Sequence, residues 1–269
     1  MTAPARVLIV AGSDSGGGAG IQADIKSVTC LGGYAATAIT AVTAQNSQGV
    51  FGVVDMPSGF VGQQMALVLD DIGADAIKTG MLGKAAVIAE ISGVLAAKAA
   101  DIPLVVDPVM LATSGHSLLD DAALGALRSQ LIPRASLLTP NIPEAAALTG
   151  LKIEDPTAML EAGRALLCLG PAAVLIKGGH LPGDELVDML VMRDGVHSFP
   201  GKRIASVHTH GTGCSLASAI AEGLGRKLAL PAAIERARAY VRQAIATAPG
   251  FGKGQGPLNH GHTLRPFSR

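Results

Sequence analysis

Short apolar runs alternate along the chain with longer segments of helical spacing. The apolar runs are rich in Ala or β-branched residues and end at Gly, Asp, Asn or Pro, which predicts buried strands. These strands are expected at 6–11, 34–43, 75–79, 103–107, 136–139 and 173–177. Helices are expected at 57–72, 84–98, 116–130, 156–169, 213–226 and 231–247. The repeated order of strand, helix and strand predicts parallel strands joined by right-handed crossovers.

Two further apolar segments flank a turn in the second half of the chain. Segments 185–192 and 196–200 lie on either side of Arg193-Asp194-Gly195. An Asp-Gly turn between such runs predicts a β-hairpin, here at a sheet edge. No linker, repeat or low-complexity tract interrupts the pattern. We therefore expect one domain over 1–269, of the α/β class, with three α/β/α layers and helices on both faces of a mostly parallel sheet.

Composition narrows the class of protein. The chain has 269 residues, of which 49% are hydrophobic and 16% charged, so it is not intrinsically disordered. Lys+Arg and Asp+Glu are equal at 21 each, Trp is absent and aromatics are 3%, which disfavours a nucleic-acid partner. No apolar stretch reaches the ~18–20 residues of a membrane span. Three cysteines without a CxxC pattern favour a reducing, cytoplasmic setting.

Polar and glycine residues follow the carboxyl ends of the expected strands. In an open α/β sheet, ligands bind at that edge. The segments that follow the six strands in order are 12–20, 45–46, 79–81, 107–110, 139–144 and 177–180. Their clustering at one edge is the strongest indication of a site. The G-x-G-x-x-G and Walker A fingerprints are both absent, which disfavours a dinucleotide dehydrogenase and a P-loop enzyme.

The segment His210-Gly211-Thr212-Gly213-Cys214-Ser215 opens an apolar helix. A glycine-flanked helix start presents backbone N–H groups that bind phosphate or a developing oxyanion. Cys214 lies in the first turn, where helix-end electrostatics contribute about 0.3–1 kcal/mol, too little to ionise most of the thiol at neutral pH. A small buried cysteine at a helix start is an equally good interpretation.

Several other polar residues have two interpretations each. Asn141 and Glu144 have the spacing of a capping box. Asp107 has the position of a Mg²⁺ ligand and of a turn-forming Asp before Pro. Asp24 has a purely structural interpretation, as an acid that favours the first turn of a helix. Gln45 likewise has a structural interpretation, as the end of a strand, although a Gln amide also matches the donor and acceptor edge of an aminopyrimidine. Lys177 is either a strand-end lysine or a phosphate clamp.

Two histidine pairs raise the question of a zinc site. The pairs are His208 with His210 and His260 with His262. No cysteine or acid completes a spacing typical of structural zinc, so a zinc site is disfavoured.

These motifs together resemble the ribokinase superfamily, and within it the hydroxymethylpyrimidine/phosphomethylpyrimidine kinases of thiamine biosynthesis. The resemblance covers nearly the whole chain. It rests on the motifs at 11–24, 40–46, 78–82, 107–110, 139–144, 177–180, 210–214 and 256–260. It implies a ribokinase-like fold and an ATP- and Mg²⁺-dependent kinase, with a K⁺ requirement left open. The substrate would be 4-amino-5-hydroxymethyl-2-methylpyrimidine and then its monophosphate, and the assembly a homodimer.

The resemblance also implies a role for each matching residue. Cys214 would be catalytic, in place of an aspartate base, and Gly211, Thr212 and Gly213 would form the anion hole. Asn141 and Lys177 would bind ATP, and Asp107 and Glu144 would organise Mg²⁺. The substrate would be bound by Gly12, Ala19, Asp24, Gln45, Met81 and Val109. Residues 113–116 resemble the flap that shields such a site, and His208 departs from the pattern expected beside the ATP.

Three rival functions stay open at this point. The nearest is a pyridoxal or pyridoxine kinase of the same superfamily, since pyridoxal is also a hydroxymethyl-substituted aza-aromatic. A hydrolase with Cys214 as nucleophile would need a partner base. A third possibility is a non-catalytic protein that binds a vitamin precursor. In such a protein the candidate Mg²⁺ ligands and phosphate-binding residues would have no role.

Overall fold

The computed structural model describes residues 3–110 and 119–265. Its strands form one nine-stranded sheet in the order β3-β2-β1-β4-β5-β6-β7-β8-β9. The strands are β1 (Arg6–Asp14), β2 (Tyr34–Asn46), β3 (Gly49–Asp55), β4 (Ala76–Thr79), β5 (Leu104–Val106), β6 (Leu137–Leu138), β7 (Ala173–Ile176), β8 (Glu185–Met192) and β9 (Gly195–Lys202). The six strands from β2 to β7 in the spatial order pair in parallel. The edge pairs β2–β3, β7–β8 and β8–β9 are antiparallel.

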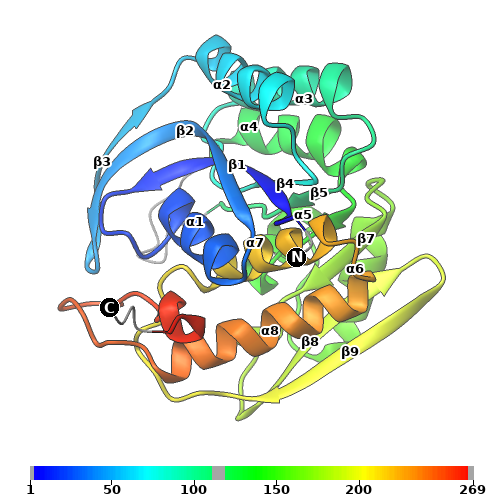
Figure 1. Cartoon of the computed structure of the whole chain (residues 1–269). Helices are drawn as coiled ribbons and strands as arrows, with labels where there is room; N and C mark the ends of the chain where they lie inside the picture. Colours follow the sequence, from blue (N-terminus) through cyan, green and yellow to red (C-terminus); the bar gives the residue numbers. More distant parts are fainter. Residues whose placement is uncertain (1–2, 111–118, 266–269) are drawn as a thin grey trace.

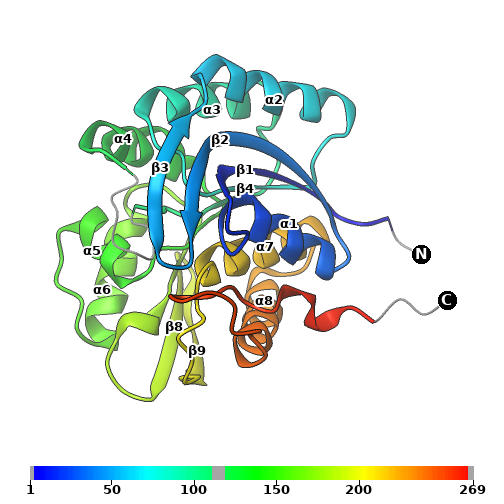
Figure 2. The same ribbon diagram turned by 90° about the vertical axis from the view of Figure 1, so that its left-hand side faces the viewer.

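Helices cover both faces of this sheet (Figures 1 and 2). They are α1 (Gly20–Cys30), α2 (Ser58–Asp71), α3 (Ala85–Lys98), α4 (Asp121–Ala126), α5 (Ile142–Thr149), α6 (Pro156–Leu167), α7 (Thr212–Gly225) and α8 (Leu230–Ala246). Figure 2 shows α2, α3 and α4 on one side of the strands and α1, α7 and α8 on the other. The predicted α/β fold with three layers and a mostly parallel sheet is confirmed.

The alternation of side chains along the central strand builds two cores. Leu8 and Val10 of β1 pack into the core beneath α2 to α6, whereas Val7 and Ile9 pack into the core beneath α1, α7 and α8. Successive residues of a strand point to opposite faces, so a strand buried on both faces is apolar throughout. This explains why the first strand could be recognised from a continuous apolar run.

Several elements differ from the expected ranges, and α1, α5 and β3 were not among the expected helices and strands. The second strand continues to Asn46 and returns as β3, which was not predicted because nearly all of its side chains are exposed and no buried alternation marks it. The helix expected at 116–130 begins at Asp121, because Asp120 caps it by accepting a hydrogen bond from the Ala123 N–H at 2.8 Å. It then continues as a π-helical turn over Leu127–Leu131.

The predicted edge hairpin is confirmed as β8 and β9, which pair antiparallel around a two-residue turn at Arg193 and Asp194, with Gly195 paired to Met192. The described part of the chain contains no helix long and apolar enough to cross a membrane. The segment compared with a flap, 113–116, lies outside the described residues.

Candidate active site

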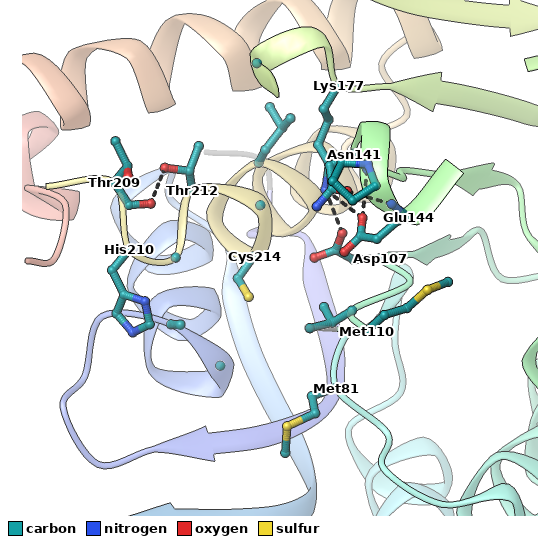
Figure 3. Close-up of a pocket in the computed structure, with 18 of the residues that line it drawn as sticks. Met81, Asp107, Met110, Asn141, Glu144, Lys177, Thr209, His210, Thr212 and Cys214 are labelled. Carbon is teal, nitrogen blue, oxygen red and sulfur yellow. Dashed lines mark hydrogen bonds and ion pairs between the residues drawn. The ribbon is translucent and has the colours of Figure 1, made fainter. Parts of the chain in front are cut away.

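A cavity of about 980 Å³ opens at the carboxyl ends of the central strands. This edge is where an α/β sheet of this kind binds ligands. All but one of the predicted site residues line it. They are Gly12, Ala19, Gln45, Met81, Asp107, Val109, Asn141, Glu144, Lys177 and Gly211 to Cys214. Figure 3 shows Cys214 between His210 on one side and Lys177, Asp107 and Glu144 on the other.

The exception is Asp24, which lies beneath the cavity and not on its wall. Its carboxylate is fully buried and pairs with the equally buried Nζ of Lys78 at 2.8 Å. The hydroxyl of Ser218 donates a second hydrogen bond to Asp24 at 2.7 Å. The structure therefore corrects the expectation that Asp24 binds the substrate directly: its oxygens are occupied by groups that compensate the cost of burying its charge.

The first turn of α7 forms one wall of the cavity. Gly211 has a φ of +82°, and a Cβ at this position would collide with the carbonyl oxygen of Gly18, so both the backbone conformation and the space require glycine. The Thr212 hydroxyl donates to the Thr209 carbonyl at 2.7 Å and fixes the entry to the helix. The N–H groups of a first helical turn lack partners within the helix, and residues Gly211 to Cys214 line the cavity. The Thr212 N–H donates to the Thr209 carbonyl at 3.2 Å, before the helix.

Cys214 carries a protonated thiol at neutral pH. Burial raises its pKa, and the charges of Asp24 and Asp107 raise it further. The Lys78 charge and a hydrogen bond from the Gly20 backbone N–H act in the opposite direction, and the result is a pKa of about 12. The sequence predicted a mostly protonated thiol because helix-end electrostatics are too weak to ionise it. In the structure, burial is the stronger cause of its protonation.

A second group of charges faces Cys214 across the cavity. The Lys177 Nζ lies 3.0 Å from the Asp107 carboxylate and 3.9 Å from that of Glu144. The Thr139 hydroxyl donates to Asp107 at 3.2 Å. Burial raises the pKa of Glu144 to about 7, with the Lys177 charge lowering it and the Asp107 charge raising it. One lysine between two buried carboxylates can bind a polyphosphate and a cation together.

The capping box predicted for Asn141 and Glu144 is confirmed. The Asn141 side chain accepts from the Glu144 N–H at 2.9 Å, and the Glu144 carboxylate accepts from the Asn141 N–H at 2.7 Å. This capping box starts α5 and also places both side chains on the cavity wall. The structural and the functional roles are therefore compatible.

Two carboxylates of the cavity wall are of the kind that holds Mg²⁺. Among the described residues there is no group of three or more His, Cys, Asp or Glu that could hold a metal ion. Mg²⁺ is commonly held by one or two carboxylates together with phosphate oxygens and water, which Asp107 and Glu144 can provide. Of the histidine pairs, His210 contacts Asp14 at 2.9 Å and His260 contacts Ser215 at 2.8 Å.

Two residues of the site were not found from the sequence. Asp14 ends β1, and its carboxylate organises the glycine-rich loop 15–20. It could have been noticed as the acid that precedes a run of glycines. Arg203 lines the far end of the cavity and donates to the carbonyls of Gly179, Leu181 and Gly183 at 2.6–2.9 Å. An arginine just after an edge hairpin carries no sequence signal for this role.

The unusual His208 also borders the carboxy-terminal segment. Its Nδ1 is buried and has no hydrogen-bond partner in the described structure. A Cβ on Gly256 would lie 2.5 Å from that nitrogen, so the segment around 256 packs closely on the histidine.

Comparison with known proteins places these features in a family. The chain matches the family described as phosphomethylpyrimidine kinase over residues 14–259. It is 47% identical to a hydroxymethylpyrimidine/phosphomethylpyrimidine kinase of Streptomyces coelicolor, over 97% of this chain and 96% of that protein. It is 50% identical to the thiamine biosynthesis bifunctional protein ThiED of Geobacter sulfurreducens, over 94% of this chain. In that case the chain spans 52% of the longer relative.

A solved structure supports the fold. The ADP complex of pyridoxal kinase from Bacillus subtilis superposes with a TM-score of 0.88 at 32% identity, covering 96% of this chain and 98% of that one. Identity to this pyridoxal kinase is thus lower than to the Streptomyces kinase and to the Geobacter protein.

Proposed function

Because the chain belongs to the phosphomethylpyrimidine kinase family, we propose that it phosphorylates 4-amino-5-hydroxymethyl-2-methylpyrimidine and then its monophosphate, giving the diphosphate for thiamine biosynthesis. The observation that carries this proposal is the arrangement of one cavity with the first turn of α7 and Cys214 on one wall and Lys177, Asp107 and Glu144 on the other. One wall suits an acceptor oxygen and the other suits a bound nucleoside triphosphate.

The anion hole acts where charge develops during transfer. In each step an oxygen of the substrate attacks the γ-phosphorus of ATP, the bond from that phosphorus to the bridging oxygen breaks, and ADP leaves. The transition state is loose, so positioning and charge stabilisation matter more than a strong base. The N–H groups of Gly213 and Cys214 in the first turn of α7 stabilise negative charge on the transferred group, whereas the Thr212 N–H donates to the Thr209 carbonyl at 3.2 Å. Lys177 and Asn141 position the ATP phosphates.

Cys214 is assigned the contact with the nucleophile in the first step. Since its thiol is protonated, it holds the hydroxymethyl oxygen in line by hydrogen bonding, and the hydroxyl proton leaves late to an oxygen of the transferred phosphoryl group. In the second step the nucleophile is already a phosphate oxygen, and no proton needs to leave it. The role of Cys214 is therefore confined mainly to the alcohol.

Mg²⁺ is proposed as the cofactor that accompanies ATP, and it would neutralise charge on the phosphates when bound. Asp107 and Glu144 would hold it, directly or through water. The Lys177 ammonium between these carboxylates keeps their charges balanced until the nucleotide arrives. A K⁺ requirement is left to measurement.

The second candidate is a pyridoxal kinase, favoured by the structural match described above. The higher identity of the pyrimidine kinases favours the first function. The hydrolase alternative is disfavoured because Cys214 is protonated and His210 is engaged with Asp14. The charged wall opposite Cys214 would have no role in a protein that only binds a vitamin precursor.

The test is product identification by mass spectrometry. Purified protein is incubated with ATP and Mg²⁺ and with either hydroxymethylpyrimidine or pyridoxal. We expect the monophosphate and then the diphosphate of the pyrimidine. If only pyridoxal yields a monophosphate, the protein is a pyridoxal kinase and the first proposal is wrong.

We further propose a homodimer in a reducing, cytoplasmic setting. The three cysteines are free, which supports such a setting. The exposed large apolar side chains of β3 and α2 support a second copy of the chain as the partner, because a partner would remove them from water. They include Phe51, Val54, Phe60 and Leu67.

A further inference from the structure

The lysine of the charged wall is fixed through its main chain. The Lys177 N–H donates to the Pro140 carbonyl at 2.9 Å. The next N–H along the chain, that of Gly178, donates to the Asp188 carboxylate at 2.9 Å. The peptide groups on both sides of the Lys177 Cα are therefore held, and the ammonium reaches Asp107 from a fixed point (Figure 3).

Gly178 lies so close to β8 that only glycine fits. A Cβ at this position would collide with the carbonyl oxygen of Val187, the residue before Asp188. The turn after β7 is thus in direct contact with the main chain of β8. This close approach brings the Gly178 N–H within reach of the Asp188 side chain.

Asp188 is itself held by a second contact. It lies on the face of the sheet that α8 covers, since Leu190, two residues further along β8, packs into the core beneath α1, α7 and α8. The Nε of Arg238 in α8 donates to the other carboxylate oxygen of Asp188 at 2.7 Å. Arg238 also donates to the carbonyl of Phe199, which pairs with Asp188 across the hairpin, and its guanidinium carbon lies 5.5 Å from the centre of the Phe199 ring.

This arrangement gives the carboxylate two different tasks. The side chains of Asp188 and Arg238 are 17% and 13% exposed, so each needs partners that offset its lost hydration. One oxygen of Asp188 meets the arginine, and the other accepts from a backbone N–H, which is a stronger hydrogen bond to a charged acceptor than to a neutral one. Balancing Arg238 alone would not require the contact with Gly178.

We propose that Asp188 is a positioning residue for Lys177, which holds the turn after β7 so that the ammonium meets the phosphates of ATP. This inference rests on the proposed role of Lys177 in binding ATP. It gives the antiparallel hairpin of β8 and β9 a function at the site, because the hairpin brings Asp188 to the turn while α8 supplies Arg238.

The experiment is a double-mutant cycle between positions 188 and 177. It is read by kcat/KM for ATP in the first phosphorylation and by the Kd of ATP with Mg²⁺ in calorimetry. Asp188→Ala should lower kcat/KM at least about tenfold and weaken ATP binding, the loss typical of a hydrogen bond to a charged group. In a Lys177→Met background the same change should cost about twofold or less, because the residue through which Asp188 acts is gone. The Kd of hydroxymethylpyrimidine should stay within about twofold throughout.

Asp194→Ala is the matched control. It removes a carboxylate from the exposed turn of the same hairpin and should change neither kcat/KM nor the Kd of ATP. If Asp188→Ala does not fold, the cycle uses Asp188→Asn, which keeps the size of the side chain but removes its charge. The same dependence on Lys177 is expected.

Equal losses in the two backgrounds would overturn the inference, because Asp188 would then support only the fold. Unchanged kcat/KM and ATP binding in a folded variant at position 188 would overturn it too. A protein that binds ATP but phosphorylates no pyrimidine would refute the proposed function instead. The calorimetric cycle would then still decide whether Asp188 acts through Lys177.

Discussion

At the scale of single residues, the site is governed by charges that the protein has buried in pairs. Lys78 is fully buried against Asp24, and Lys177 lies against Asp107. Removing one member of such a pair leaves an uncompensated charge, which typically costs about 3–5 kcal/mol. Cys214 lies among these groups, and its protonation state is set by burial and by the balance of their charges.

Ligands of α/β sheets bind at the carboxyl ends of the strands, and this rule predicts which of these residues lie at the cavity. Asp107 and Lys177 each follow an apolar run, so their place at the cavity could be inferred from the sequence. Asp24 lies within a helix, where no such rule applies, and only the side-chain packing shows that Lys78 reaches it from β4. Pairings between residues 54 positions apart leave no local pattern in the sequence.

Substitution of Cys214 tests its assigned role. Cys214→Ala should reduce the rate of the first phosphorylation at least about tenfold more than that of the second, because only the first uses an alcohol. Both rates are measured separately, starting from the alcohol and from the monophosphate. Equal losses in the two steps would show that Cys214 supports the fold of the site and does not contact the nucleophile.

At the scale of elements, the start of α7 depends on the carboxy-terminal segment. The Ser215 hydroxyl donates to the Gly211 carbonyl at 2.8 Å and accepts from the Nε2 of His260 at 2.8 Å. The hydroxyl of Tyr240 in α8 donates to the His260 carbonyl at 2.9 Å. The capping box of α5 could be predicted from the spacing of Asn and Glu, but this contact joins segments far apart in the chain.

The burial of His260 gives folding a pH dependence. Burial lowers the pKa of His260 to about 4 from 6.5, and the charge of Lys26 contributes. Above pH 6.5 the imidazole is neutral in both states. As the pH falls from 6.5 toward 4, only the unfolded chain binds the proton, so stability is lost.

His260→Gln should remove this part of the pH dependence, which amounts to about 1–3 kcal/mol. Urea denaturation at pH 7 and pH 5 measures it. The variant should be less stable than the unaltered protein at pH 7 but lose less on acidification. His197→Gln, at an exposed histidine of β9, is the control and should keep the original slope. An undiminished loss in His260→Gln would contradict the prediction.

At the scale of the whole molecule, three layers place every described catalytic candidate at one edge of the sheet. The alternation of apolar and helical segments was enough to predict this arrangement. It was not enough to predict β3, which extends the sheet beyond its helices and has little buried surface of its own (Figure 1). A strand with so few buried side chains shows no apolar alternation, so sequence periodicity does not reveal it.

If the protein is a homodimer that associates through β3, polar substitutions in β3 should lower the mass of the assembly in solution. Phe51 and Val54 are 72% and 65% exposed. Phe51→Asp with Val54→Asp should convert a dimer to a monomer in sedimentation equilibrium, because charge at an apolar interface must be desolvated on association. Val196→Asp, on the opposite edge strand, should leave the dimer intact. A monomeric unaltered protein would refute the proposed assembly.

The ion pair between Lys78 and Asp24 has a consequence for the order of events on the ribosome. Ser218, which completes the hydrogen bonds of Asp24, is synthesised 194 residues after it, and α7 packs against β1 and β4. A nascent chain that stops before residue 212 leaves this side of the two strands uncovered and a charged pair open to water. The nascent chain therefore cannot complete its fold before α7 has been synthesised. Until then, we expect chaperones to bind its exposed apolar surface.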